Sequence, residues 1–451
     1  MNLESGIQNS EFTIQNSQFS LPRYPRYRAS GVEWLGDVPE HWDVQSLRAV
    51  AGLYVEKNQP DLPVLSVYRE YGVILKDSRD DNHNATSLDT SNYKVVRPGD
   101  LAVNKMKAWQ GSLGVSEHHG IVSPAYITCR LNQEKVTGRY IHYLLRSKSL
   151  IGALDSISYG VRVGQWDMRF EDFKKVGITI PPKPEQDRIV AFLDKKTAEI
   201  ATLISKKQRQ IELLDEQKAI LINRAVTRGL NPNAKLKPSG IDWIGDIPQH
   251  WEVKKARNLT SKIGDGLHGT PIYDDSSDIA FINGNNLTAG RVIVGEATRR
   301  VSAKTLRDHF HDFDQSTILL SINGTLGSAA VYRGERIMLG KSAAYLKFKS
   351  EVDPLFAYYV LTSVGYVRHF YREASGTTIH NLSLATLRSL PITLPSRDEQ
   401  RAILDELRSL EEQIGVVHHQ IQAQIRSLKI LRSTLIAHTV TGKVKVNKLL
   451  Q

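Results

Sequence analysis

The chain carries the same fifteen-residue motif twice, and this duplication constrains its fold more than any other feature. Residues 30–44 read SGVEWLGDVPEHWDV and residues 239–253 read SGIDWIGDIPQHWEV, 209 positions later. Nine of the fifteen positions are identical, and the other six exchange Val or Leu for Ile, or exchange Asp, Glu and Gln among themselves. Two copies at so long a period indicate two similar modules in one chain and not a solenoid of short repeats. Both copies are termed the opening motif.

A second pair of segments repeats at a shift of 214 positions. Residues 178–181 read ITIP and residues 392–395 read ITLP, and a Glu-Gln pair follows each of them, at 185–186 and 399–400. Each half of the chain is therefore expected to contain the opening motif, a divergent region and a long closing helix.

Composition narrows the class of protein. The 451 residues, 41% hydrophobic and 24% charged, are too many for one core and predict several packing units in a soluble chain. No run reaches the ~20 apolar residues that a membrane helix needs, so we expect a cytoplasmic protein with no membrane partner. Cys129 is the only cysteine, which excludes an internal disulfide and a multi-cysteine zinc site. The net charge of +11 favours a polyanionic partner.

The divergent regions predict an α+β fold class. Short apolar segments between turn signals indicate strands at 64–75, 94–103, 121–129, 279–282, 318–322 and 343–348. Residues 138–150 and 354–373 have helical composition and spacing. We therefore expect two similar α/β domains related by a pseudo-twofold internal repeat.

The closing segments predict two long helices, at 183–228 and 396–440. Apolar residues recur every three or four positions from Ile189 to Leu221 and again from Ile403 to Leu435. A helix of about 40 residues measures about 60 Å, which is longer than the domain that would have to cover it. We therefore expect the helices to pair as a coiled coil, although each could instead lie on its own domain.

These motifs together resemble the specificity subunit of type I restriction-modification systems. The resemblance is carried by the doubled opening motif, by the proline before each Glu-Gln helix start, and by the helix ends AVTRGL and TVTGKV at 225–230 and 439–444. It covers nearly the whole chain after Arg26.

The resemblance implies that two target-recognition domains, separated by an antiparallel coiled coil, each read one half of a bipartite, asymmetric DNA site. The implied partners are double-stranded DNA, two adenine-N6 methyltransferase (modification) subunits, and restriction subunits that use ATP. The chain itself would be non-catalytic, without cofactor or metal. The implied parts are an N-terminal extension 1–25, a first recognition domain 26–182, a helix 183–228, a linker 229–238, a second recognition domain 239–395, a helix 396–440 and a tail 441–451.

Base reading needs donors and acceptors of fixed geometry, so loops rich in cations and amides are the candidate DNA contacts. In the first domain these are Lys105, Lys107, Trp109, Gln110, Ser112, Arg162 and Gln165. In the second domain they are His268, Thr270, Asn283, Asn285, Asn286, Asn323, Thr325, Thr377 and Asn381. The alternative for each loop is a solvated turn in which Asn and Gly only supply unusual backbone angles.

The aromatic residues of the opening motif form a separate set of candidates. They are Trp34, His41, Trp42, Trp243, His250 and Trp251. Because they are the same in both halves, they cannot distinguish two different half-sites. We expect them to close the domains or to dock the methyltransferase subunits.

Two apparent catalytic signatures fail on inspection. Gly264 to Gly269 fits GxGxxG but runs into Pro271 instead of a helix, which argues against a dinucleotide site. Gly340-Lys341-Ser342 suggests a phosphate loop, but Glu335 occupies the position of its first glycine. The alternatives left open are a self-sufficient methyltransferase or nuclease and a coiled-coil adaptor that binds only proteins.

Overall fold

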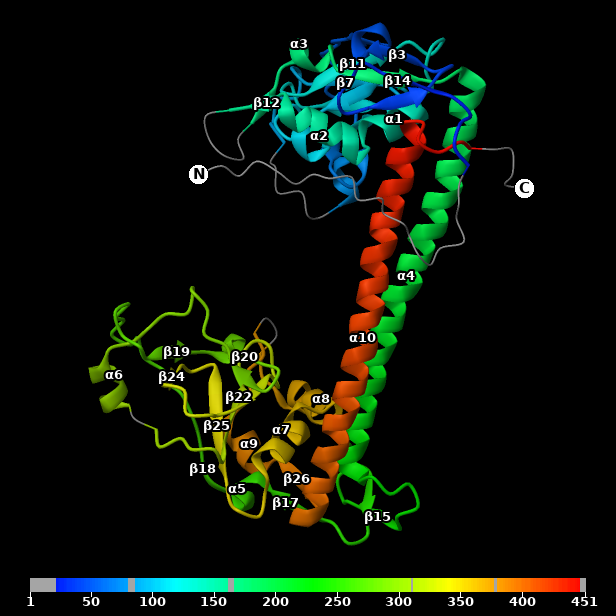
Figure 1. Ribbon diagram of the computed structural model, residues 1–451. Coiled ribbons are helices and arrows are strands. Elements are labelled where there is room, and N and C mark those ends of the chain that lie inside the picture. Colours follow the sequence, from blue (N-terminus) through cyan, green and yellow to red (C-terminus); the bar gives the residue numbers. More distant parts are fainter. Residues whose placement is uncertain (1–21, 80–85, 161–165, 310, 377–378, 447–451) are drawn as a thin grey trace, which may run out of the picture. The chain divides into compact units, whose positions relative to one another are not determined.

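The computed structural model describes residues 22–79, 86–160, 166–309, 311–376 and 379–446. Contacts within the chain divide it into two compact units (Figure 1). Unit 1 joins the chain up to Lys206 with the chain from Ala423, and unit 2 is Lys207–Gln422. Each unit contains one divergent region and part of both long helices.

Both units are built on a four-stranded antiparallel sheet with the same topology. The order in unit 1 is β4 (Ala51–Leu53), β11 (Ile127–Leu131), β8 (Leu101–Val103), β9 (Leu113–Val115). The order in unit 2 is β18 (Thr260–Asp265), β25 (Ala343–Phe348), β22 (Thr317–Ser321), β23 (Ala329–Val331). Thus the repeat read from the opening motif extends through the divergent regions, where the sequences no longer match.

Helices pack on one face of each sheet and enclose the main cores. In unit 1 these are α1 (Gly138–Leu145), α2 (Lys148–Ser156) and α3 (Phe170–Phe173), and in unit 2 they are α7 (Pro354–Thr362), α8 (Val364–Glu373) and α9 (Leu384–Ser389). Leu101 of β8 and Leu144 of α1 belong to one buried cluster, and Leu320 of β22 and Phe356 of α7 belong to the other. The α+β class is confirmed.

The sequence predicted one helix where the structure has two, once in each unit. Residues 138–150 divide at Ser147, whose hydroxyl accepts a hydrogen bond from the Leu150 amide and caps α2. Residues 354–373 divide at Ser363, whose backbone is extended (φ −68°, ψ 151°). Serine competes with the helical hydrogen bond through its own side chain, so the apolar spacing continued across a break that it could not reveal.

Short ladders complete the units. Two ladders occur in both units. The first pairs β1 (Tyr27–Ala29) with β2 (Asp37–Pro39) in unit 1 and β15 (Leu236–Pro238) with β16 (Asp246–Pro248) in unit 2. The second pairs β3 (Asp43–Ser46) with β14 (Gly177–Ile180) in unit 1 and β17 (Glu252–Lys255) with β26 (Pro391–Leu394) in unit 2. Those of unit 1 are β5 (Leu65–Tyr68) with β6 (Gly72–Leu75), β7 (Lys94–Val96) with β10 (Gly120–Val122), and β12 (Ser158–Tyr159) with β13 (Asp167–Met168). Those of unit 2 are β19 (Ala280–Ile282) with β24 (Ile337–Leu339) and β20 (Leu287–Thr288) with β21 (Arg291–Val292), together with the short helices α5 (Ala256–Leu259) and α6 (Ala303–Asp308).

The two long helices are α4 (Lys183–Arg228) and α10 (Arg397–Val440). In unit 1, Leu193 near the start of α4 shares a core with Val440 at the end of α10. In unit 2, Val226 near the end of α4 shares a core with Ile403 near the start of α10. The helices therefore run in opposite directions in each unit, as an antiparallel coiled coil requires.

An ion pair joins the two helices within unit 2. The Lys218 ammonium lies 2.9 Å from the Glu411 carboxylate. Both groups are partly exposed, so the pair fixes register more than it stabilises the helices. In the part of the chain that the structure describes, neither these helices nor any other is long and apolar enough to cross a membrane.

Candidate nucleic-acid interface

The two candidate loops of unit 1 lie together. The first follows β8, and the second is the hairpin of β12 and β13. The rings of Trp109 and Trp166 have centroids 4.8 Å apart, and the Lys105 ammonium lies 2.9 Å from the Asp167 carboxylate. The Met168 amide also donates to the Lys105 carbonyl at 3.1 Å. Arg162 and Gln165, the other candidates in this hairpin, lie outside the described residues.

The side chains of the first loop differ in how far they are available to a ligand. Ser112 is only 3% exposed, and Lys105 is held by its ion pair. Trp109 donates its indole N–H to the Met106 carbonyl at 3.1 Å. Lys107 is exposed and Gln110 is partly exposed, and neither side chain has a hydrogen-bond partner among the described residues. These two are the polar side chains that the loop leaves free.

Four of the candidates in unit 2 line one polar pocket. Asn283, Asn285, Asn323 and Thr325 surround it together with Ser321 and Ser342. They come from the turn after β19 and the turn after β22, which are 40 residues apart in the sequence but adjacent in the fold. The structure therefore brings together loops that the sequence could only name separately.

Asn381 joins this group through Asn323. The two residues pair as an isolated antiparallel bridge, and the Asn323 amide group donates to the Asn381 side-chain oxygen at 3.4 Å. Ser375 pairs with Asn381 in the same way, and the predicted contact Thr377 between them lies outside the described residues.

Asn286 has a structural role. Its side-chain oxygen accepts from the Asn283 amide at 2.9 Å, and its amino group donates to the Ile293 carbonyl at 3.1 Å. Together with Asn283 it forms a reciprocal cap on a single 3₁₀ turn at Gly284–Asn286. The alternative of a turn-forming asparagine fits this position better than base reading.

His268 and Thr270 are exposed in a loop that passes beside the same pocket. The Leu267 amide donates to the Leu339 carbonyl at 2.8 Å, which holds the loop against Gly340. A Cβ on Gly340 would lie 2.5 Å from the side-chain oxygen of Asn283, which lines the pocket, so a larger residue at position 340 would displace Asn283. The His268 ring lies 2.7 Å from the Asp265 carboxylate.

The candidate loops occupy equivalent places in the two units. In each, one loop follows the third strand of the sheet order, β8 or β22, and meets a second segment at 158–168 or 375–381. In unit 1 these segments present tryptophan rings and cationic side chains, whereas in unit 2 they present amide and hydroxyl groups. The two units thus share a scaffold and differ in the chemistry that they present.

The opening motif buries one tryptophan in each copy, while many of its other residues are exposed. Trp42 and Trp251 are both 0% exposed. Each lies against a glycine just past the end of a long helix. A Cβ on Gly442 would lie 3.1 Å from the Trp42 ring, and a Cβ on Gly229 would lie 3.2 Å from the Trp251 ring. Both glycines have left-handed backbones (φ +75° and +71°), which favour glycine and end the helices. The geometry favours the domain-closing alternative for these tryptophans.

The histidines of the opening motif make the same contact in both units. His41 lies 2.9 Å from the Glu185 carboxylate, and His250 lies 2.9 Å from the Glu399 carboxylate. Tyr24 also donates its hydroxyl to Glu185, and burial together with this carboxylate raises the pKa of Tyr24, so that the phenol stays neutral. The contacts join the opening motif to the first turn of each long helix.

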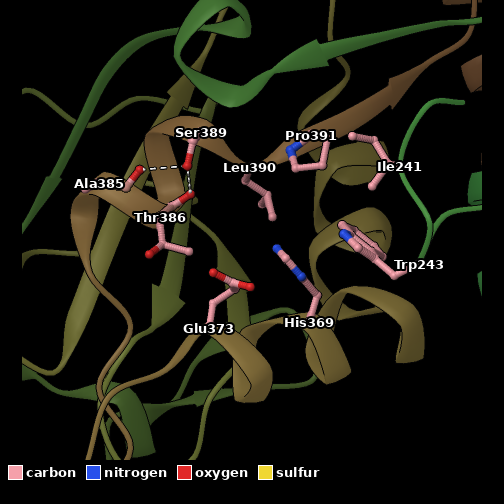
Figure 2. Close-up of a pocket in the computed structure, with 9 residues that line it drawn as sticks. All are labelled: Ile241, Trp243, His369, Glu373, Ala385, Thr386, Ser389, Leu390 and Pro391. Atoms are coloured by element: carbon pink, nitrogen blue, oxygen red, sulfur yellow. Dashed lines mark hydrogen bonds between the residues drawn. The ribbon is translucent and has the colours of Figure 1, made fainter.

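Trp34 and Trp243 are partly buried. Trp243 stacks on His369 with ring centroids 4.4 Å apart and an interplanar angle of 13°. Figure 2 shows the pocket beside this stack, which is lined by His369 and Glu373, one turn apart on α8. Burial lowers the pKa of His369, and Glu373 opposes that shift. Among the described residues, Trp34 of unit 1 has no such stack, so this contact does not repeat as the histidine contacts do.

Two buried glutamines that were not among the candidate site residues, Gln186 and Gln400, hold this junction. Gln186 is 0% exposed; it donates to the carbonyls of Lys135 and Pro181 and accepts from the Thr137 amide. Gln400 repeats the pattern with Glu351, Pro395 and Asp353. Their signal was the repeated Glu-Gln pair itself.

Two threonines bind the opposite helix ends. The Thr179 hydroxyl donates to the Val440 carbonyl at 2.8 Å in unit 1, and the Thr393 hydroxyl donates to the Val226 carbonyl at 2.7 Å in unit 2. Each threonine lies in the strand that leads into one long helix, and its hydroxyl caps the end of the other long helix. The carbonyl that it binds lacks a partner within its own helix, because the last carbonyls of a helix have no amide beyond them.

We expect Gln400→Ala to lower the free energy of unfolding of unit 2 by about 1–3 kcal/mol, because it leaves buried backbone groups without partners. Chemical denaturation of the purified subunit measures the change. Gln413→Ala, on the exposed side of the same helix, is the matched control and should have little effect. Equal effects of the two substitutions would contradict the role of the buried amide.

No group of three or more His, Cys, Asp or Glu side chains in the described ranges could hold a metal ion. Cys129 is buried, and burial raises the pKa of its thiol to about 12.

Comparisons with known proteins agree with this architecture. The model of the type I restriction modification DNA specificity domain matches residues 57–213 and 249–427. The type I restriction enzyme MjaVIII specificity subunit of Methanocaldococcus jannaschii is 23% identical over 432 residues, which are 91% of this chain and 95% of the relative. The EcoBI specificity subunit of Escherichia coli is 20% identical over 358 residues, 77% of this chain and 74% of the relative.

A solved structure shares the fold. It comes from a study of complex assembly and conformational transition in the type I restriction-modification system, and it has a TM-score of 0.62 at 17% identity over 89% of this chain and 98% of that one. The repeated sheet topology and the two matches of the family model lead to one conclusion: the chain belongs to the type I restriction-modification DNA specificity family and carries one copy of the family's domain in each half.

Proposed function

We propose that this chain is the DNA sequence-recognition subunit of a type I restriction-modification complex. The observation that carries the proposal is the pair of loops that each unit presents at equivalent places on sheets of the same topology, with different side chains. Equivalent scaffolds with different chemistry are suited to reading two different half-sites. The excess of positive charge supports binding to the phosphate backbone.

The parts of the chain have separate roles in this proposal. Residues 26–182 and 239–395 are the two target-recognition domains, and each reads one half of a bipartite, asymmetric site. The helices at 183–228 and 396–440 form the spacer that sets the distance between the half-sites. A coiled coil suits this role because it resists compression, whereas a flexible linker would not.

We further propose that the chain is non-catalytic and works with two adenine-N6 methyltransferase subunits and with restriction subunits. The outward sides of the His41–Glu185 and His250–Glu399 contacts are matched positions for two copies of one partner, since they repeat in both units. A self-sufficient methyltransferase or nuclease would act without partner chains, and a protein-binding adaptor would not bind DNA.

Sequencing of adenine methylation in host genomes with and without this chain tests the proposal. The expected result is a two-part, unequal methylated motif that disappears on deletion and returns on complementation. Methyl transfer or cleavage by the purified chain alone would support the self-sufficient enzyme instead. Absence of any motif change would contradict the proposed function.

Lys107 should act as a phosphate contact in unit 1. We expect Lys107→Ala to weaken binding of the assembled complex to all duplexes alike and to reduce the slope of log K against log salt by about 1. Fluorescence anisotropy over a salt series measures both. Lys135→Ala removes an equally exposed charge outside the candidate loops, and an equal change for that variant would contradict a specific contact.

A further inference from the structure

The polar pocket of unit 2 is an arrangement of amides with few competing groups. Asn283, Asn285 and Asn323 line it, and Asn381 is attached through Asn323. The remaining lining residues carry hydroxyl groups or no side chain. No Lys or Arg side chain is among the lining residues of this described pocket.

Asn285 presents a complete amide. Its side chain is exposed and has no hydrogen-bond partner among the described residues. Asn283 has its oxygen committed, since it accepts from the Ser342 hydroxyl at 3.0 Å. The free groups of Asn285 are therefore one donor and one acceptor, while Asn283 can add only a donor.

Asn323 and Asn381 together present the same complement as a single free amide. One amino group and one oxygen are used in the bond between them, at 3.4 Å. One oxygen and one amino group remain, whichever way the two amides are turned. Asn285 in the pocket and the Asn323–Asn381 pair that joins it thus each keep one donor and one acceptor free.

This complement matches one base edge in the major groove. Adenine presents the N7 acceptor beside the N6 amino donor, and an amide of Asn or Gln satisfies both at once. Guanine presents two acceptors, N7 and O6, which would place an amide oxygen against a base oxygen. Arg and Lys, the side chains that bind guanine, are missing from the pocket lining.

A phosphate anchor lies beside the pocket. Lys341 is exposed and immediately precedes Ser342, which lines the pocket. No carboxylate lies within ion-pair distance of its ammonium group among the described residues. Gly324 lines the pocket, and a Cβ added to it would have no other atom within 4 Å. The backbone at this position is therefore open to a close approach by a ligand.

We infer that the amide groups of Asn285 and of the Asn323–Asn381 pair read adenine in the half-site of unit 2, while Lys341 holds the adjacent phosphate. This inference rests on the proposed function and names the base that the second domain selects. The first domain offers Lys107 and Gln110 at the equivalent place, so its half-site has a different requirement.

The test measures discrimination by the complex assembled with its methyltransferase subunits. The probes are the duplex with the genomic motif and duplexes in which each A·T pair of the second half-site is replaced by G·C. Asn285→Asp keeps the size of the side chain and removes the donor, and Asn323→Ala removes one member of the pair. We expect either change to lower the affinity ratio at one A·T position about 10- to 100-fold, with the other half-site unaffected.

Two controls distinguish the outcomes. Asn258→Ala removes an exposed amide of unit 2 outside the pocket and should leave every ratio unchanged, and Gln110→Ala should affect only the first half-site. Unchanged discrimination in the folded Asn285→Asp complex and in the Asn323→Ala complex, or a loss confined to G·C positions, would overturn the inference while the proposed function stands. A wild-type complex without any preferred site would overturn both.

Discussion

Removing seven residues from each long helix should abolish methylation of the original site and create a site with a shorter spacer. The deletions are 208–214 in α4 and 415–421 in α10, which lie at equal distances from the Lys218–Glu411 ion pair and so preserve the antiparallel register within unit 2. A heptad measures about 10 Å along the helix axis, which corresponds to about three base pairs of DNA. Sequencing of adenine methylation in the host gives the new spacer directly.

Single deletions provide the control for this experiment. Removing only 208–214 shifts the preceding part of α4 by a heptad against α10, while the Lys218–Glu411 pair keeps its place within unit 2. We expect loss of methylation without a new motif, because the helices can no longer pair along their full length. A paired deletion that leaves the spacer of the target unchanged would show that the coiled coil does not set it.

Trp251→Ala should lower the free energy of unfolding of unit 2 by about 3–5 kcal/mol, since a fully buried indole is replaced by a cavity. Among the described residues its indole N–H has no hydrogen-bond partner, so the loss comes from packing alone. Hydrogen exchange of the purified subunit locates the effect, and thermal unfolding measures its size. Exchange should rise first around the end of α4 and the start of α10.

Trp109→Ala is the matched comparison. Its ring packs on Trp166 in a partly exposed loop, so we expect a stability change of about 1 kcal/mol and a clear loss of DNA affinity. The two tryptophans should thus separate stability from recognition. Equal destabilisation by both substitutions would contradict the assignment of Trp251 to the core and Trp109 to the surface.

The sequence sufficed for the architecture because the architecture depends on periodic patterns. The doubled opening motif predicted two modules, and apolar spacing predicted the long helices, whose observed bounds are Lys183–Arg228 and Arg397–Val440. Patterns of this kind survive divergence, because any apolar residue of suitable size keeps the core. The same tolerance hid the breaks at Ser147 and Ser363, where a polar side chain and not the spacing ends the helix.

The candidate site was predicted less completely. The loops were named, but their residues looked alike: Asn285 and Asn286 are neighbours of the same type, and only the structure shows that Asn286 caps a turn while Asn285 is free. Ser112 likewise proved to be buried. Whether a polar group is available to a ligand depends on which partners surround it, and those partners come from distant parts of the chain.

The amino-acid sequence by itself determined the duplication, the α+β class, the helical spacer and the family resemblance, since these follow from local periodicity and from motifs that repeat. Tertiary structure alone decided that Asn323 meets Asn381 and that Trp42 and Trp251 of the opening motif are buried. It also decided that the end of each long helix is capped by a threonine from the strand that leads into the other long helix. These contacts join residues tens to hundreds of positions apart. No local pattern specifies them, because they form only when the strands and helices of a unit pack together.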